Sequence, residues 1–224
     1  MASLWFRTVK LWCNTGSSMS QTVTRSRRVR LGPRSAGVLL SLEEFDRARF
    51  EEGWRYELIN EVLVVSPYPL RNERDPNEEL GRSLRNYQES HPQGSALDAT
   101  LAEETIETKR NRRRPDRVIW AGLGHLPGPH EPPTIVAEFV SEGKVNQERD
   151  YVVKRAEYRE IGVKEYWIID RFAKTMTVWT FAADGDRQCV ITANQTYETP
   201  LLPGFKLSLR RLLELASRWP RKRK

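Results

Sequence analysis

The sequence has little cysteine and little histidine, with two cysteines and three histidines among its 224 residues. Cys13 and Cys189 lie far apart, and they form neither a disulfide framework nor the cysteine and histidine spacing of a zinc site. This usage predicts a protein of a reducing compartment, the cytoplasm. His91, His125 and His130 stand beside proline or glycine in predicted loops, where we expect solvated side chains rather than ligands.

Long hydrophobic runs are also missing, and no apolar stretch is long enough to span a bilayer. The first residues are interrupted by Arg7 and Lys10, and they lack the apolar core and small-residue cleavage site of a secretory signal. Met19 is an alternative start to Met1. A hydrophobic fraction of 38% with seven tryptophans predicts a folded body, and the length suits one domain.

Acidic residues are absent from both ends of the chain. Residues 1–37 hold seven Lys or Arg, and residues 218–224 hold five more. Because the net charge is only +7, the middle of the chain carries a charge near −5. We predict disordered basic tails at 1–37 and 218–224 around one domain at 38–217. The alternative for the tails is non-specific affinity for nucleic acid or an anionic surface.

Local patterns predict an α/β domain, in which a mixed β-sheet is flanked by helices and carries β-hairpins. Ser41 and Glu44 form a capping box before one helix, and Asn60 with Glu61 marks a hairpin turn. One strand, a strong helix and a second strand form a βαβ unit. The predicted helices cover 41–53, 77–91 and 146–162; the strands cover 95–108, 114–122, 134–142 and 164–170; a hairpin covers 175–193; and 205–216 is a strand entering a last helix.

The strong helix carries a lysine on its apolar stripe. Tyr151, Lys154 and Tyr158 recur at helical spacing, so Lys154 should face the sheet and needs an anionic partner there. Glu138 offers one from an otherwise apolar strand, and Asp116 heads the strand before it.

Two carboxylates and an ammonium at one end of a sheet are the parts of a hydrolytic metal site. Carboxylate oxygens hold Mg²⁺ or Mn²⁺, and a lysine can orient the attacking water. The alternative is structural: Asp116 caps a turn, and Lys154 forms an ordinary salt bridge with Asp150.

Four segments resemble the Uma-two family of restriction-endonuclease-like proteins, within the PD-(D/E)XK nuclease superfamily: "YELI", "RPDRVIW", "IVAEFVS" and "RDYVVKRAEYREIGVKEYWIID". The resemblance runs from about Ser41 to "LLPGFKLSL". It implies a restriction-endonuclease-like fold and a Mg²⁺- or Mn²⁺-dependent endonuclease acting on nucleic acid, with DNA as the expected substrate.

The resemblance also implies roles for individual residues. Asp116 would be the first metal ligand and Glu138 the second acid, with Glu57 completing the site and Asp98 matching an accessory acid. The lysine that commonly follows two residues after the second acid is replaced by Val140. The resemblance is then to nucleases whose lysine has moved to the next helix, which is the position of Lys154.

Some features depart from the family or stay open. Glu61 stands where the family commonly has glycine, the usual histidine before the following helix is missing, and Lys144 is a fallback for the catalytic lysine. Four arginines precede Asp116, and they either contact phosphates or guard a solvated strand edge: Arg110, Arg112, Arg113 and Arg114. A homodimer would suit cleavage of two strands. The alternative function is a catalytically inactive nuclease-like fold that binds nucleic acid or protein.

Overall fold

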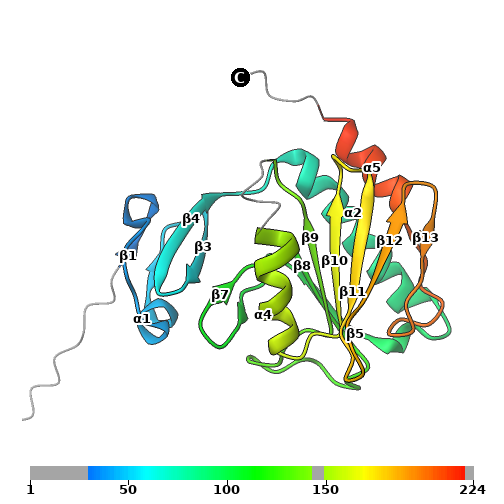
Figure 1. The fold of residues 1–224 in the computed structure, drawn as a ribbon, viewed down its shortest axis with the longest axis horizontal. Coiled ribbons are helices and arrows are strands. Elements are labelled where there is room, and N and C mark those ends of the chain that lie inside the picture. The colour runs from blue at the N-terminus through cyan, green and yellow to red at the C-terminus, as the bar shows by residue number, and fades with distance from the viewer. Residues whose placement is uncertain (1–29, 143–148, 220–224) are drawn as a thin grey trace, which may run out of the picture.

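The larger of the two main sheets of the protein is mixed and has six strands (Figure 1). The computed structural model describes residues 30–142 and 149–219. Strands follow the order β12-β11-β10-β9-β8-β5, in which β9 and β10 are parallel and the other neighbours are antiparallel. The mixed sheet and its flanking helices confirm the predicted α/β class. No helix of the described ranges is both long and apolar enough to cross a membrane.

The elements alternate between short strands and a few helices. The strands are β1 Arg30–Leu31, β2 Arg49–Phe50, β3 Trp54–Ile59, β4 Val62–Pro67, β5 Leu97–Ala102, β6 Ile106–Glu107, β7 Arg112–Arg113, β8 Arg117–Ala121, β9 Ile135–Phe139, β10 Glu165–Asp170, β11 Thr175–Thr180, β12 Arg187–Thr192, β13 Thr196–Tyr197 and β14 Leu207–Ser208. The α-helices are α1 Leu42–Arg47, α2 Arg71–Ser90, α4 Lys154–Glu160 and α5 Leu209–Ser217, and a π-helical turn at Arg149–Val153 leads into α4.

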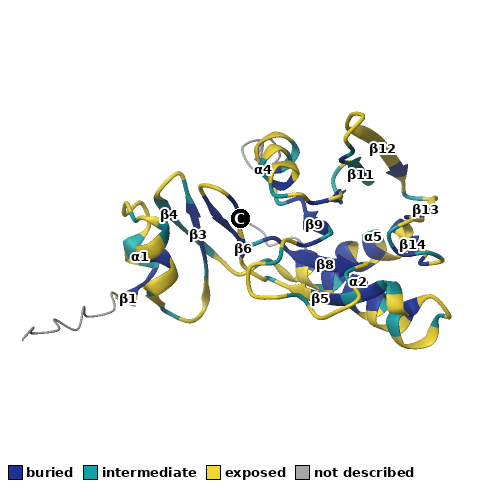
Figure 2. Ribbon diagram, turned by 90° about the horizontal axis from the view of Figure 1, so that it is seen from below, coloured by how far each residue is buried: buried dark blue, intermediate teal, exposed yellow. Residues whose placement is uncertain are grey.

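Helices cover both faces of the larger sheet. Helices α2 and α5 lie on one face, and α4 lies on the other (Figure 2). Because successive strand residues point to opposite faces, Ala137 of β9 packs toward α2 and α5, while Val136 packs toward α4 with Tyr158. Glu138 therefore belongs to the α4 face, in the position that the sequence pattern predicts for the partner of Lys154.

A second, four-stranded sheet in the order β4-β3-β7-β6 stands beside the first (Figure 1). The predicted hairpin is confirmed as β3–β4, and Asn60 and Glu61 both take positive φ values, 49° and 65°, at its turn. The capping box of α1 is also confirmed, since Ser41 and Glu44 exchange side-chain to backbone hydrogen bonds. This sheet has a small core of its own: Leu31, Phe45, Tyr56, Leu58 and Leu63.

Several boundaries differ from those predicted. Helix α2 begins at Arg71 rather than at residue 77 and continues through Pro76. The predicted strand at 95–108 divides into β5 and β6, and the predicted helix at 146–162 is π-helical before α4. Part of the predicted N-terminal tail is structured, because β1 pairs with β2, while residues 1–29 lie outside the described residues.

Candidate active site

The strand pairing between β8 and β9 brings the two predicted metal-binding acids together. Arg117 of β8 pairs with Ala137 of β9 in an antiparallel register. Asp116, which immediately precedes β8, therefore lies opposite Glu138 of β9. Both carboxylates are buried, with 6% and 3% of their residue surface exposed. Two neighbouring buried carboxylates need positive charge around them to remain ionised.

Helix α4 supplies one positive charge directly to Glu138. Lys154 Nζ lies 2.7 Å from Glu138 Oε1, and the hydroxyl of Tyr158 donates to the same oxygen over 2.8 Å. Lys154 is itself only 3% exposed. Burial and the nearby Glu138 charge raise the pKa of Tyr158 well above its usual value, so its phenol remains a donor. Two donors on one oxygen fix the orientation of the Glu138 carboxylate.

Asp116 is held by a backbone group and by an arginine. Its Oδ2 accepts the backbone N–H of Phe139 over 2.7 Å, and its Oδ1 lies 3.3 Å from Nη1 of Arg55. Burial first, and the Glu138 carboxylate second, raise the pKa of Asp116 to about 8, although Arg55 and Lys154 oppose the shift. Asn77 of α2 donates to the Asp116 carbonyl, which fixes the backbone at this point.

Strand β3 of the smaller sheet contributes the other wall of the site. Arg55 and Glu57 are two residues apart on this strand and share one of its faces. Glu57 is buried, and its Oε1 accepts the backbone N–H of Arg114 over 3.1 Å, two residues before Asp116. Burial alone would lower the pKa of Arg55, but the surrounding carboxylates, Asp116 foremost, raise it, so the guanidinium stays charged.

A cavity of about 350 Å³ lies between the two sheets, and its lining includes Arg55, Glu57, Asp116, Glu138 and Lys154. Among the described residues that line it, five are acids and two are bases. The acids are Glu57, Glu73, Asp116, Glu138 and Glu142, and the bases are Arg55 and Lys154. The excess of carboxylate suits a divalent cation, which Mg²⁺-binding proteins commonly hold with one or two carboxylates, water and substrate phosphate.

Hard oxygen donors fit such an ion, but the residues that the structure describes do not supply a complete shell of ligands. Within residues 30–142 and 149–219, no three His, Cys, Asp or Glu side chains are grouped to hold a metal. Asp116 and Glu138 are therefore the residues that would hold one, with Glu57 bracing the loop beside them.

A family model for Uma2, described as "putative restriction endonuclease", matches residues 42–210. The chain belongs to the Uma2 family. A crystal structure of a protein described as a putative nuclease belonging to DUF820, from Anabaena variabilis ATCC 29413, superposes on this Uma2 chain with a TM-score of 0.61 and 16% sequence identity. The match covers 79% of this chain and 99% of that one, and it shows a nuclease-like fold. Among curated proteins, no sequence matches the chain.

The arginines that precede Asp116 in this Uma2 protein have different surroundings. Arg112 is buried and makes a two-pronged ion pair with Asp46 of α1, at 2.9 and 2.7 Å. Arg113 is 1% exposed and makes a similar pair with Glu157 of α4, at 2.7 and 2.6 Å.

Neither buried arginine lines the cavity, and the guanidinium of each is engaged by a carboxylate. Arg110 is exposed, and Arg114 is partly exposed, with its Nε donating to the Glu103 carbonyl. Neither of these lines the cavity either.

Asp98 and Lys144 complete the set of predicted residues. Asp98 lies at the other end of the larger sheet, where its two oxygens accept the N–H groups of Leu123 and Gly124. It anchors the loop after β8 and does not line the cavity. Lys144 lies outside the described residues.

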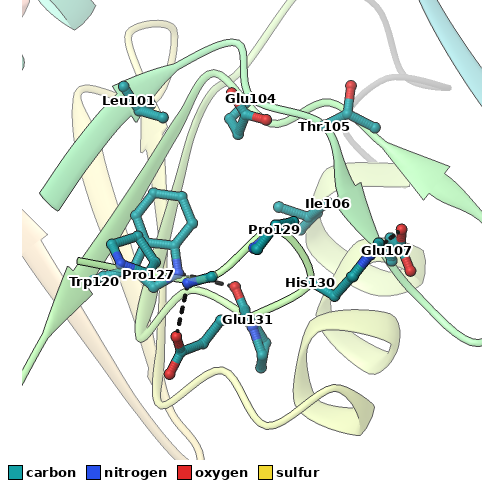
Figure 3. Close-up of a pocket in the computed structure, with 12 residues that line it drawn as sticks. Leu101, Glu104, Thr105, Ile106, Glu107, Trp120, Pro127, Pro129, His130 and Glu131 are labelled. Atoms are coloured by element: carbon teal, nitrogen blue, oxygen red, sulfur yellow. Dashed lines mark hydrogen bonds and ion pairs between the residues drawn. The ribbon is translucent and has the colours of Figure 1, made fainter. Parts of the chain in front are cut away.

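A second cavity, of about 200 Å³, is lined by neither Asp116 nor Glu138. It lies between Trp120 and a proline-rich loop at residues 127–132 (Figure 3). The indole N–H of Trp120 donates to the Glu131 carbonyl, and His130 pairs with Glu107 at 2.9 Å. None of the predicted catalytic residues lines it. Its contacts are those of a loop packed on a strand.

Two residues of the site were not predicted in these roles. No local pattern marks Arg55, because its partners Glu103 and Asp116 are distant in sequence, although its spacing of two from Glu57 in a strand places both on one face. Tyr158 belongs to the apolar stripe of the helix, but its hydroxyl contact with Glu138 depends on the tertiary packing.

Proposed function

We propose that this Uma2 protein is a divalent-metal-dependent endonuclease that hydrolyses nucleic-acid phosphodiester bonds, with DNA as its substrate. The observation that carries the proposal is the pairing of Asp116 with Glu138 at adjoining strand ends, with Lys154 2.7 Å from Glu138. The family membership supports the reaction class.

In this proposal Asp116 and Glu138 would hold the ion, which would supply Lewis-acid activation of the phosphoryl group and of a water. Lys154, which contacts Glu138, would position the attacking water and balance developing negative charge. Tyr158 keeps Glu138 in one orientation, and Glu57 holds the backbone before Asp116. Burial of these side chains lowers the local dielectric constant, which strengthens each of these interactions.

The test is cleavage of supercoiled plasmid by the purified protein with Mg²⁺ or Mn²⁺, beside EDTA, with the variants Asp116→Asn and Lys154→Met. We expect metal-dependent cleavage that each variant reduces by roughly 100-fold or more. Glu165→Gln is the matched control for Asp116→Asn, because Glu165 is also a buried carboxylate and its strand partner Ile135 lies at the far end of β9 from Glu138. It accepts hydrogen bonds from Trp167, Tyr197 and Thr199.

Cleavage that survives both active-site changes would assign the activity to a contaminant. Binding of nucleic acid without cleavage under any metal condition would instead favour the catalytically inactive binding module. A Glu165→Gln variant as inactive as the site variants would indicate that fold damage, rather than lost chemistry, explains the effect.

A further inference from the structure

Arg55 is the positive charge that stands among the acids of the cavity without a role in the proposed reaction. It projects from β3 of the smaller sheet, whereas Asp116 and Glu138 belong to the larger one. Its side chain is 15% exposed and lines the cavity. The negative charges that act on it are those of Asp116, Glu103, Glu138 and Glu57.

Three contacts hold the guanidinium of Arg55, and they are unequal. Its Nη2 donates to the Arg114 carbonyl, and its Nε lies 2.9 Å from Oε2 of Glu103. Its Nη1 lies 3.3 Å from Oδ1 of Asp116, which is long for a charge-assisted hydrogen bond, where about 2.7–2.9 Å is usual. Nη2 is thus anchored on the backbone, the ion pair between Nε and Glu103 lacks hydrogen-bond geometry, and the hydrogen bond from Nη1 to Asp116 is long.

The contact with Asp116 is also the one that a bound cation would weaken. A divalent ion on Asp116 would occupy its carboxylate oxygens and would repel the guanidinium. A phosphate oxygen brought to the same ion would offer Nη1 a replacement acceptor, because guanidinium groups suit phosphate geometry. Lys154 is the other cation among the described residues that line the cavity. Its Nζ lies 2.7 Å from Oε1 of Glu138, so it is less available to bind a phosphate oxygen.

We propose that Arg55 binds the phosphate of the substrate, exchanging its contact with Asp116 Oδ1 for a phosphate oxygen when a divalent cation occupies the site. The inference rests on the proposed function and adds a substrate-contacting residue to it. It predicts effects of opposite sign when the charge is removed. Metal binding should tighten, because a competing cation leaves Asp116, and nucleic-acid binding should weaken, because a phosphate contact is lost.

The experiment uses the full chain with the variants Arg55→Met and Arg55→Lys. Mn²⁺ alone is titrated by calorimetry, and a labelled short DNA duplex is titrated in Ca²⁺ by fluorescence anisotropy. For Arg55→Met we expect Mn²⁺ affinity to rise several-fold and DNA affinity to fall roughly 10-fold, in the range of one hydrogen bond to a charged group. Arg159→Met is the control, since Arg159 makes an exposed ion pair with Asp186 away from the cavity.

Arg55→Lys keeps the charge and loses the planar fork, so we expect weaker DNA binding with little change in Mn²⁺ affinity. This variant carries the test if Arg55→Met does not fold, as judged by circular dichroism. Both affinities falling together, or neither changing, would overturn the assignment. If the unmodified protein binds neither Mn²⁺ nor DNA, the proposed function fails as well; if it binds both and Arg55→Lys matches it, only the role of Arg55 fails.

Discussion

Asp116 keeps its carboxyl group in an environment that opposes ionisation. It is 6% exposed, and burial followed by the neighbouring Glu138 raises its pKa to about 8. In an unfolded chain an aspartate titrates near 3.9. Between these two pH values the folded protein binds a proton that the unfolded chain has released.

The stability of the metal-free protein should therefore fall as the pH rises. A raised folded-state pKa contributes stability that is complete below the unfolded pKa and is lost as the pH passes through the folded pKa. In EDTA, we expect the free energy of unfolding to decline between about pH 5 and about pH 8, and Asp116→Asn to remove that part of the decline. Urea titrations of both proteins across this range provide the measurement, and parallel profiles for the two would contradict it.

The site shows which residues a sequence can reveal. Asp116, Glu138 and Lys154 carry local signals, because each is a charged group within an apolar pattern, and the structure brings them together. Arg112 and Arg113 carry charge in an exposed-looking run, and no local pattern reveals that Asp46 and Glu157 bury them as ion pairs. Arg55 meets Asp116 across 61 positions of sequence, a pairing that only the tertiary fold creates.

Strand β7 links the smaller sheet to the helix that carries Lys154. Arg113 of β7 pairs with Glu157, which lies three residues after Lys154 on α4. Arg113 is almost fully buried, so removing its charge leaves the partly buried Glu157 without its arginine partner. A buried pair that loses one member is strongly destabilising.

Arg113→Met should cost about 3 kcal/mol of unfolding free energy. Arg110→Met, the same change at an exposed position of the same segment, should stay within about 0.5 kcal/mol of the unmodified protein. Chemical denaturation monitored by tryptophan fluorescence compares the two. Equal effects would mean that the Arg113 pair contributes no more than a surface charge.

Helix α2 shows how packing sets element boundaries. The sequence pattern starts this helix at residue 77, but the helix begins at Arg71 and retains Pro76 because Asn72, Pro76 and Leu80 are all buried against the sheet. Glu73 also accepts the backbone N–H of Leu70 ahead of the first turn. Tertiary contacts here outweigh the local preference against proline.

Gly81 of α2 should behave unlike an ordinary helical glycine. Alanine is usually favoured over glycine inside a helix by up to about 1 kcal/mol. A Cβ at Gly81 would lie 2.6 Å from Nη2 of Arg117, whose guanidinium is fixed by Asn77 and Thr100. Gly81→Ala should therefore destabilise the protein, while Asn86→Ala on the exposed side of the helix should not. Thermal melts of both variants test this, and a stabilised Gly81→Ala would contradict the close approach.

The two sheets differ greatly in the size of their cores. The cluster at the smaller sheet contains five buried hydrophobic residues, two of them from β1 and α1, whereas more extensive clusters cover both faces of the larger sheet. Fewer buried apolar contacts mean a lower free energy of local opening.

Amides of β3 and β4 should exchange hydrogen for deuterium faster than those of β8, β9 and β10. We expect the difference to be present without ligand and to be measurable by mass spectrometry of peptides from each sheet. Exchange at one common rate would show that the sheets open only together, as a single cooperative unit.

The two-sheet construction has a consequence for heat resistance. Asp116, Glu138 and Lys154 all belong to the larger sheet and its helix, while Arg55 and Glu57 belong to the smaller one. Opening of the smaller sheet would remove one wall of the cavity and leave the acids and the lysine in place. On warming, the affinity for the proposed substrate should then fall at a temperature at which most of the secondary structure survives. The affinity should return on cooling, because the core of the larger sheet does not have to refold.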